Sequence, residues 1–220
     1  MKALCLGTAM WGWSVDQDTA FSLLDYFYEN GGRYVDTANN YPLNGNANDY
    51  KKSPLFIAQW CRSRAVNDLK VTCKIGSVSN VNSPDNDLSA VYLQEQVRVL
   101  IEAFSDNFHC AMLHWDNRSE VAAIEETLIG LDSLCEHNIE LGLSGILAPA
   151  LYKELLVKRP AMPLNVQVKH NFLQCQMDHY QPLACFSPKY WAYGISVSGL
   201  KLHAQEYEHS SYVSLVRSKD

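Results

Sequence analysis

The chain has 220 residues, of which 47% are hydrophobic and 19% charged, and its formal net charge is -6. A chain of this length can bury roughly 70% of the surface that its unfolded form exposes, so a single domain over residues 1–220 is expected. Its few lysines and arginines are scattered and do not gather in a run or along one helix face. This argues against nucleic acid or an anionic membrane as the main partner.

The cysteines and the apolar segments together predict the cellular compartment in which the protein is found. The seven cysteines are odd in number, widely spaced, without a CxxC pair, and mostly inside apolar runs, which predicts buried thiols in a reducing compartment. The N-terminal MKALCLGTAMWGW lacks the long apolar core and cleavage site of a signal peptide, and no stretch approaches the ~20 apolar residues that cross a bilayer. A soluble cytoplasmic protein is expected.

Short apolar runs alternate with amphipathic segments along the whole chain. The expected strands are 2–7, 33–37, 69–74, 109–114, 139–144, 164–168 and 193–198, and the expected helices are 18–30, 53–65, 89–105, 119–136, 148–158 and 178–188. Strands and helices alternating at roughly 25 to 40 residues per unit predict a parallel sheet with helical crossovers. Because the strands are almost continuously apolar, helices should cover the outer face of the sheet.

Seven such units occupy the chain to residue 200 and leave room for one short strand at 212–216. The predicted fold is α/β, a (β/α)8 TIM barrel that is shortened or incomplete at the last βα unit, since such barrels take about 250 residues and at least about 200. An uncovered or unpaired end of the barrel would favour a homo-oligomer. Loops 42–52 and 77–88 follow strands and should lie at the C-terminal face, where barrels build active sites.

Four polar residues stand at or just beyond the ends of consecutive strands: Asp36, Tyr41, Lys74 and His114. Their spacing directs them to one point at the barrel mouth, where they could pass a proton to a carbonyl oxygen. A tyrosine is a poor acid at pH 7, but an ammonium nearby lowers its pKa. Lys74 could supply that charge, Asp36 could hold Lys74, and His114 could donate a hydrogen bond to the substrate.

Each of these residues alone has an ordinary structural explanation. Lys74 could be a solvated strand-end residue, Tyr41 a turn tyrosine, and His114 a buried histidine with its hydrogen bonds satisfied. Asp36 is harder to explain in this way, because an acid directly after a buried strand needs a partner. The four together favour a catalytic site.

Several segments resemble, in order and spacing, the signatures of the aldo-keto reductases. They are LGTAMWGW, RYVDTANNYP, VTCKIG, MLHWD, ELGLSG and NVQVKHN, and they cover roughly residues 4–173. The resemblance implies that Tyr41 is the general acid, supported by Asp36, Lys74 and His114. It also implies that Ser144 and Gln167 bind the nicotinamide carboxamide.

Three tryptophans are candidates for the wall of a substrate site: Trp11, Trp13 and Trp115. Core or rim packing is the competing explanation for each of them. No group of His, Cys, Asp and Glu has the spacing of a zinc site, so no specific metal site is expected.

The chain departs from the family pattern in three places. Gly145 stands where the family usually has an asparagine after the fifth-strand serine. The segment GISVSGLKL offers no aromatic ring to the nicotinamide, unless Tyr190, Trp191 or Tyr193 takes that place. The basic loop after the eighth strand, which holds the adenine and 2′-phosphate of NADPH, is missing apart from Arg217 and Lys219.

The leading hypothesis is an oxidoreductase that uses NADPH to reduce a small aldehyde or ketone, such as an oxidised sugar. A second hypothesis is a cofactor-independent isomerase, epimerase or lyase that uses the same four residues, since none of these reactions needs a hydride. A third is a non-catalytic binding subunit that kept the fold without its cofactor.

Overall fold

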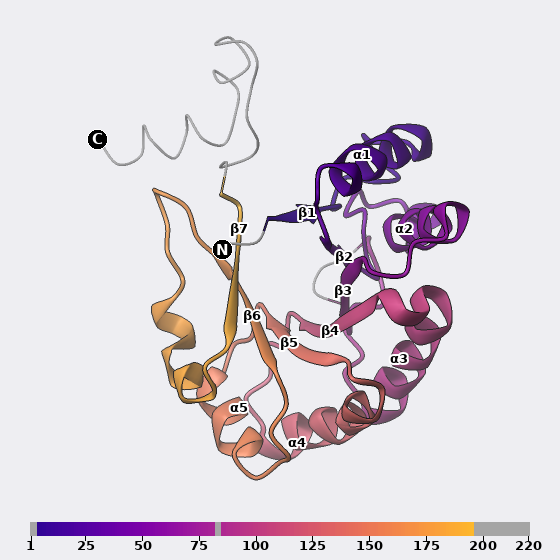
Figure 1. Ribbon diagram of the computed structural model, residues 1–220. Coiled ribbons are helices and arrows are strands. Elements are labelled where there is room, and N and C mark those ends of the chain that lie inside the picture. Colours follow the sequence, from indigo (N-terminus) through magenta and orange to yellow (C-terminus); the bar gives the residue numbers. More distant parts are fainter. Residues whose placement is uncertain (1–3, 82–84, 196–220) are drawn as a thin grey trace.

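The computed structural model describes residues 4–81 and 85–195, and seven parallel strands form one sheet in chain order. The strands are β1 (Cys5–Gly7), β2 (Tyr34–Ala38), β3 (Lys70–Ile75), β4 (Phe108–His114), β5 (Glu140–Ser144), β6 (Leu164–Lys169) and β7 (Lys189–Tyr193). The sheet curls, and the helices lie along its outside (Figure 1). This is the architecture of a (β/α)8 barrel without its last unit: among the described residues, β1 pairs only with β2 and β7 only with β6.

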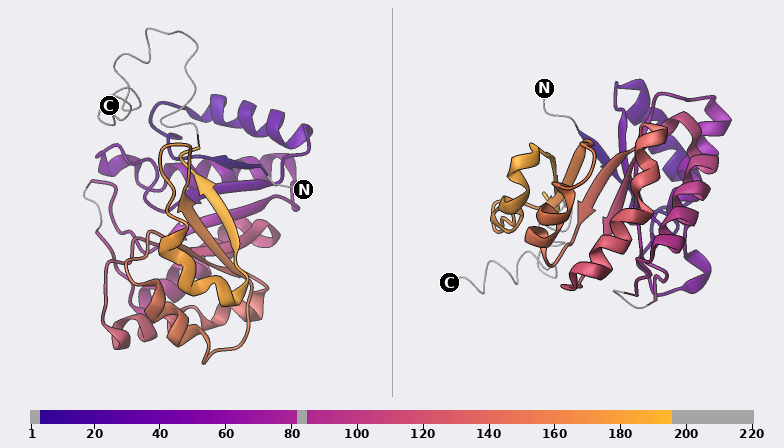
Figure 2. Two further views of the ribbon diagram at one scale, coloured as in Figure 1. Left: turned by 90° about the vertical axis from the view of Figure 1, so that its left-hand side faces the viewer. Right: turned by 90° about the horizontal axis from the view of Figure 1, so that it is seen from below.

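The helices cover the outer face of this sheet, as both further views show (Figure 2). They are α1 (Gln17–Glu29), α2 (Lys52–Arg64), α3 (Ala90–Phe104), α4 (Val121–Gly130) and α5 (Pro149–Leu156), with short 3-10 segments at η1 (Ala47–Asp49), η2 (Ser105–Asn107), η3 (Asp132–His137) and η4 (Asp178–Phe186). Asp16 caps α1 by accepting a hydrogen bond from the Thr19 backbone, and Ser89 caps α3 in the same way.

Two expected helices differ from the structure. The segment expected at 119–136 is divided into α4 and η3, and the segment expected at 178–188 is the 3-10 helix η4. Pro182 lies inside η4, where its missing N–H is one reason why a regular α-helix does not form.

The core lies between the sheet and the helices, because strand side chains alternate between the two faces. Val35, Val71 and Leu113 are fully buried under the helices. Their neighbours along the strands face the barrel interior, where Tyr34 pairs in register with Lys70 and Ala38 with Lys74. The polar side chains that could take part in chemistry therefore lie at the strand positions that face the barrel interior, and not at the positions covered by the helices.

The position of the seventh strand was predicted wrongly. It was expected at 193–198, but β7 spans Lys189–Tyr193, and the chain leaves the strand at Gly194 with a φ of +68°. Tyr190, Trp191 and Tyr193 therefore lie within the strand.

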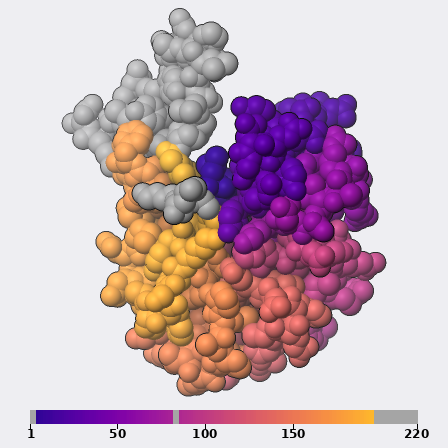
Figure 3. Space-filling model, viewed as in Figure 1, coloured from indigo at the N-terminus to yellow at the C-terminus, as the bar shows by residue number. Residues whose placement is uncertain are grey.

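In the space-filling view the yellow surface of the last described unit, which contains β7, and the indigo surface of the first unit both face the viewer (Figure 3). The eighth strand expected at 212–216 lies outside the described residues.

The cysteines are all free, but they are less buried than expected. Cys61, Cys73 and Cys110 are buried, whereas Cys135, Cys175 and Cys185 are exposed. The exposed ones belong to 3-10 or loop segments outside the sheet. Within the described ranges, the helices are too short or too polar to cross a membrane.

Candidate active site

The structure brings Asp36, Tyr41, Lys74 and His114 together at the C-terminal ends of neighbouring strands. Asp36, Lys74 and His114 lie on β2, β3 and β4, and Tyr41 lies in the loop that follows β2. Since these strands are parallel and paired in register, their C-terminal ends meet at one mouth of the barrel.

The centre of the site is a buried ion pair. Lys74 Nζ lies 2.5 Å from Asp36 Oδ2, and the side chains are only 1% and 15% exposed. Burial disfavours the ammonium, but the Asp36 carboxylate and the Tyr41 hydroxyl together outweigh burial and raise the pKa of Lys74. Lys74 is therefore charged at neutral pH and provides a fixed positive charge at the mouth.

Tyr41 lies beside this charge. Lys74 Nζ is 4.8 Å from the centroid of the Tyr41 ring. Burial raises the pKa of the Tyr41 hydroxyl, and Lys74 acts against it without reversing the shift. The ammonium alone predicts a lowered pKa for this hydroxyl. In the structure burial outweighs the ammonium, so Tyr41 is protonated at neutral pH, as a proton donor must be.

His114 is held as a neutral imidazole. It is 3% exposed, and burial together with the Lys74 charge keeps its pKa well below the usual range. Its ring centroid is 6.3 Å from that of Tyr41, and the buried Nδ1 has no hydrogen-bond partner in the described part of the chain. A neutral imidazole next to an ammonium can donate one hydrogen bond without adding a second positive charge.

Ser144 and Gln167 connect to the ion pair through a chain of hydrogen bonds. Ser144 Oγ donates to Gln167 Oε1 at 3.2 Å, and Gln167 Nε2 donates to Asp36 Oδ1 at 2.9 Å. The Asp36 carboxylate therefore receives a bond from β6 on one oxygen and Lys74 on the other. The sequence did not indicate this link, which joins strands on opposite sides of the curled sheet.

The three tryptophans have different surroundings. Trp115 stacks on His114 with ring centroids 3.9 Å apart and an interplanar angle of 26°. Trp11 is 3% exposed in the hydrophobic core, and Trp13 is 58% exposed. The core position of Trp11 leaves little of its surface for a substrate, whereas Trp115 lies directly at the site.

Gly145 makes the position of Trp115 possible. A Cβ atom at residue 145 would lie 2.5 Å from Cδ1 of Trp115, and the φ of Gly145 is +68°. The Tyr180 hydroxyl accepts hydrogen bonds from the backbone N–H groups of Gly145 and Ile146, and so fixes this turn. The glycine that departs from the family pattern thus allows the indole to pack against His114.

We expect Gly145→Asn to displace the Trp115 ring and to lower the free energy of unfolding by about 1–3 kcal/mol, the usual cost of overpacking. Asparagine tolerates a positive φ, so steric conflict and not backbone strain should dominate. Chemical denaturation and tryptophan emission, compared with Trp115→Phe, measure the effect. Gly31→Asn is the matched control, because Gly31 has a φ of +84° and a Cβ atom at that residue would have no neighbour within 4 Å. An equal loss in both variants would refute the steric explanation.

Two further residues near the site, Tyr180 and Tyr193, were hardly indicated by the sequence. Tyr193 is the last residue of β7. Burial raises the pKa of its hydroxyl, and the Lys74 charge partly opposes that rise. Its phenol therefore belongs to the electrostatic environment of the mouth. Correct placement of β7 would have indicated Tyr193, whereas the hydrogen bonds that Tyr180 accepts depend on the tertiary fold. In the described ranges no three His, Cys, Asp or Glu side chains are arranged to hold a metal ion.

Comparison with protein families identifies the class. Residues 3–196 match the model of the aldo/keto reductase family, and the chain belongs to that family. A holo-form aldo-keto reductase from Bacillus halodurans has a similar fold, with a TM-score of 0.69 and 21% identity, over 98% of this chain and 71% of that one. An aldo/keto reductase from Brucella melitensis gives a TM-score of 0.64 at 16% identity, over 97% of this chain and 77% of that one.

Curated relatives are similar over shorter segments. Norsolorinic acid reductase B of Dothistroma septosporum is 27% identical over 149 residues, which cover 61% of this chain and 36% of the relative. A norsolorinic acid reductase of Emericella nidulans is 42% identical over 75 residues, 31% of this chain and 18% of the relative. A putative aryl-alcohol dehydrogenase of Saccharomyces cerevisiae is 27% identical over 145 residues, 60% of this chain and 35% of the relative. The matches span about a third or less of these relatives.

Proposed function

We propose that the protein reduces the carbonyl group of a small aldehyde or ketone with a reduced nicotinamide cofactor. The observation that carries the proposal is the charged Lys74, which is paired with Asp36 and lies beside a protonated Tyr41 and a neutral His114. Membership of the aldo/keto reductase family supports the same reaction class.

The proposed proton transfer follows from these positions. Tyr41 gives its proton to the carbonyl oxygen as negative charge develops there, and the Lys74 ammonium stabilises the phenolate that remains. His114 donates a hydrogen bond to the same oxygen and orients the substrate. Asp36 keeps Lys74 charged and in place. A bound reduced nicotinamide supplies the hydride that the carbonyl carbon accepts.

The residues at the mouth fit the carboxamide end of such a cofactor. Ser144 Oγ and the Gln167 amide lie at the C-terminal ends of β5 and β6, next to the ion pair. Each can form a further hydrogen bond while keeping the one it has. The basic residues expected at the 2′-phosphate end, Arg217 and Lys219, lie outside the described residues. We propose that the contacts from Ser144 and Gln167 to the nicotinamide end provide most of the affinity.

The names of the relatives and the position of Trp115 favour an aromatic carbonyl compound over the oxidised sugar expected from the sequence. Norsolorinic acid reductases and aryl-alcohol dehydrogenases are among the relatives. The indole that stacks on His114 offers a flat apolar surface at the site. Aromatic aldehydes are therefore the first substrates to test.

The proposal predicts that NADPH and NADH bind with dissociation constants within about tenfold of each other, a difference below about 1.4 kcal/mol. Nicotinamide mononucleotide should bind almost as well. Calorimetry measures the constants, and Gln167→Leu, with Gln59→Leu on α2 as control, should weaken all three. Absence of both nucleotide binding and NADPH consumption with aromatic aldehydes would exclude a reductase. Strong preference for NADPH over NADH would contradict the proposal that the nicotinamide end provides most of the affinity.

A further inference from the structure

The N-terminal end of the barrel interior holds a second group of polar side chains, far along the strands from the active-site mouth. We call it the floor cluster. It consists of Tyr34, Lys70, His109, Glu140, Asn165, Lys189 and Trp191, all near the beginning of strands β2 to β7. Tyr34 of β2 contacts Trp191 of β7 with ring centroids 5.1 Å apart, and His109 of β4 at 5.9 Å. Since these strands are not paired with β2, the contacts cross the barrel interior.

Two ammonium groups converge on Tyr34. Lys70 Nζ donates to the Tyr34 hydroxyl at 3.4 Å, and Lys189 Nζ lies 4.2 Å from the centroids of both Tyr34 and Trp191. Burial would raise the pKa of Tyr34, but the two lysines lower it. The hydroxyl therefore lies in the positive potential of two ammonium groups.

The carboxylate of the floor cluster, Glu140, has partners other than these lysines. Glu140 Oε2 accepts a hydrogen bond from Asn165 Nδ2 at 2.7 Å and lies 3.4 Å from His109 Nε2. Trp191 Nε1 in turn donates to Asn165 Oδ1 at 2.9 Å. Within residues 4–81 and 85–195, neither Lys70 nor Lys189 has a carboxylate oxygen within 4.0 Å. Two like charges beside one phenol repel each other, and an anion between them would remove that repulsion.

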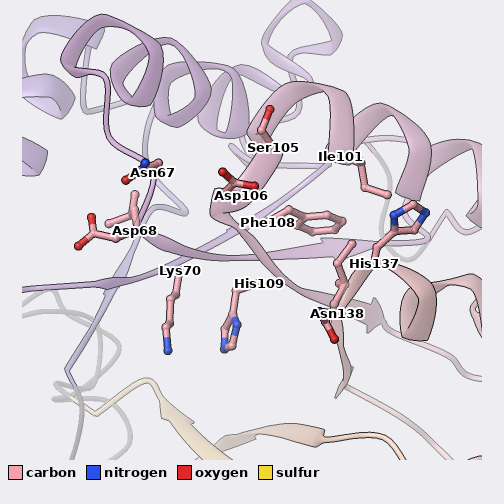
Figure 4. A pocket seen from close by; sticks show the side chains of 12 residues that line it. Asn67, Asp68, Lys70, Ile101, Ser105, Asp106, Phe108, His109, His137 and Asn138 are labelled. Carbon is pink, nitrogen blue, oxygen red and sulfur yellow. The ribbon is translucent and has the colours of Figure 1, made fainter.

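A cavity of about 660 Å³ lies beside the floor cluster and is lined by two of its residues, Lys70 and His109, among others. Lys70 and Lys189 are both exposed residues, so solvent reaches the two lysines. Figure 4 shows these two side chains pointing to the same side of the strands, with Asp106 on the opposite side. The other carboxylate of the cavity, Asp68, accepts hydrogen bonds from Tyr28 at 2.6 Å and from Arg33 at 3.0 Å. Its charge is thus compensated by Arg33 and not by Lys70.

We propose that the floor cluster binds a small doubly charged oxyanion of the phosphate class, with Lys70 and Lys189 as its charged partners and the Tyr34 hydroxyl as a hydrogen-bond donor. This site is separate from the mouth and does not depend on the reductase reaction. Charge-assisted bonds from two ammonium groups are the contacts that such an anion prefers.

The test is a titration of the full chain with inorganic phosphate at pH 7 and constant ionic strength, with chloride as the balancing salt. The ring signals of His109, assigned with His109→Gln, are followed by NMR. We expect saturable one-site binding of phosphate, and binding of acetate at least about tenfold weaker because it carries one charge. The double variant Lys70→Gln/Lys189→Gln should bind phosphate at least about tenfold more weakly.

The matched control is Lys153→Gln/Lys158→Gln, which removes the same charge from exposed positions in and just beyond α5 and should bind as the unmodified chain does. Circular dichroism and denaturation midpoints verify that all variants are folded. Binding that survives in the floor variant, equal binding of acetate, or shifts that never saturate would each overturn the proposal. If instead phosphate bound at the active-site mouth, affinity would also survive in the floor variant, and the proposal would fail.

Discussion

Replacing Tyr41 by phenylalanine is expected to lower the turnover of an aromatic aldehyde by about 10²–10⁴-fold, the range that general acid catalysis contributes. The change removes only the hydroxyl and keeps the ring beside Lys74 and His114. Binding of the nicotinamide nucleotide should be unchanged, because Ser144 and Gln167 are untouched. Steady-state kinetics and calorimetry on the same preparations separate the two effects.

Tyr26→Phe is the control for this measurement, since Tyr26 lies on α1 and is 70% exposed. If Tyr41→Phe retained full turnover, the hydroxyl would not be the proton donor, and Tyr193 would be the next phenol to test. Loss of nucleotide binding together with turnover would instead indicate that Tyr41 has a structural role.

Replacing Asp36 by asparagine is expected to lower the free energy of unfolding by about 3–5 kcal/mol, because it leaves the Lys74 ammonium buried without its counter-charge. Only 1% of the Lys74 side chain is exposed, so water cannot replace the carboxylate. The ion pair raises the pKa of Lys74 in the folded state, so its stabilisation is complete below the unfolded pKa of about 10.4 and is lost as the pH rises through the folded pKa. Urea denaturation at pH 7 measures the full effect.

The double variant Asp36→Asn/Lys74→Met should recover much of this loss, because it removes the uncompensated charge. Glu95→Gln is the surface control: Glu95 pairs with Arg98 at 52% and 64% exposure, and its loss should cost at most about 1 kcal/mol. A double variant less stable than Asp36→Asn alone would show that Lys74 stabilises the barrel by a route other than this pair.

Most of the fold could be predicted from the sequence, since each inner strand is a short apolar run covered by a helix. Strands β2 to β6 lie within about one residue of their expected positions. The seventh strand is different because, among the described residues, it pairs on one side only and its residues are exposed or half-buried, so KYWAY has no continuous apolar run. The β-branched residues of GISVS were more strand-like in composition, but Gly194 ends the strand before them.

The convergence of Asp36, Tyr41, Lys74 and His114 could be predicted because it follows from the order of parallel strands. The contacts between distant strands could not. The bond from Gln167 to Asp36 depends on how far the sheet curls, and the stacking of Trp115 on His114 depends on the positive φ values of Trp115 and Gly145. The floor cluster could not be predicted either, because its residues are spread over six strands, with one residue on each of β2 to β6 and two on β7.

The strand order of the described sheet, in which each strand pairs only with its neighbours along the chain, gives the molecule the connectivity of a linear array. A closed barrel joins its first and last strands and so makes the stability of every unit depend on all the others. Within the described sheet the backbone pairing of each βα unit comes from the adjacent units, as in repeat proteins, whereas the bond from Gln167 to Asp36 and the contact of Tyr34 with Trp191 are side-chain links across the interior. Among the described strands β1 and β7 have one paired neighbour each, so local opening is expected to begin there, while β3 and β4, which carry Lys74 and His114, keep both of their neighbours and open last.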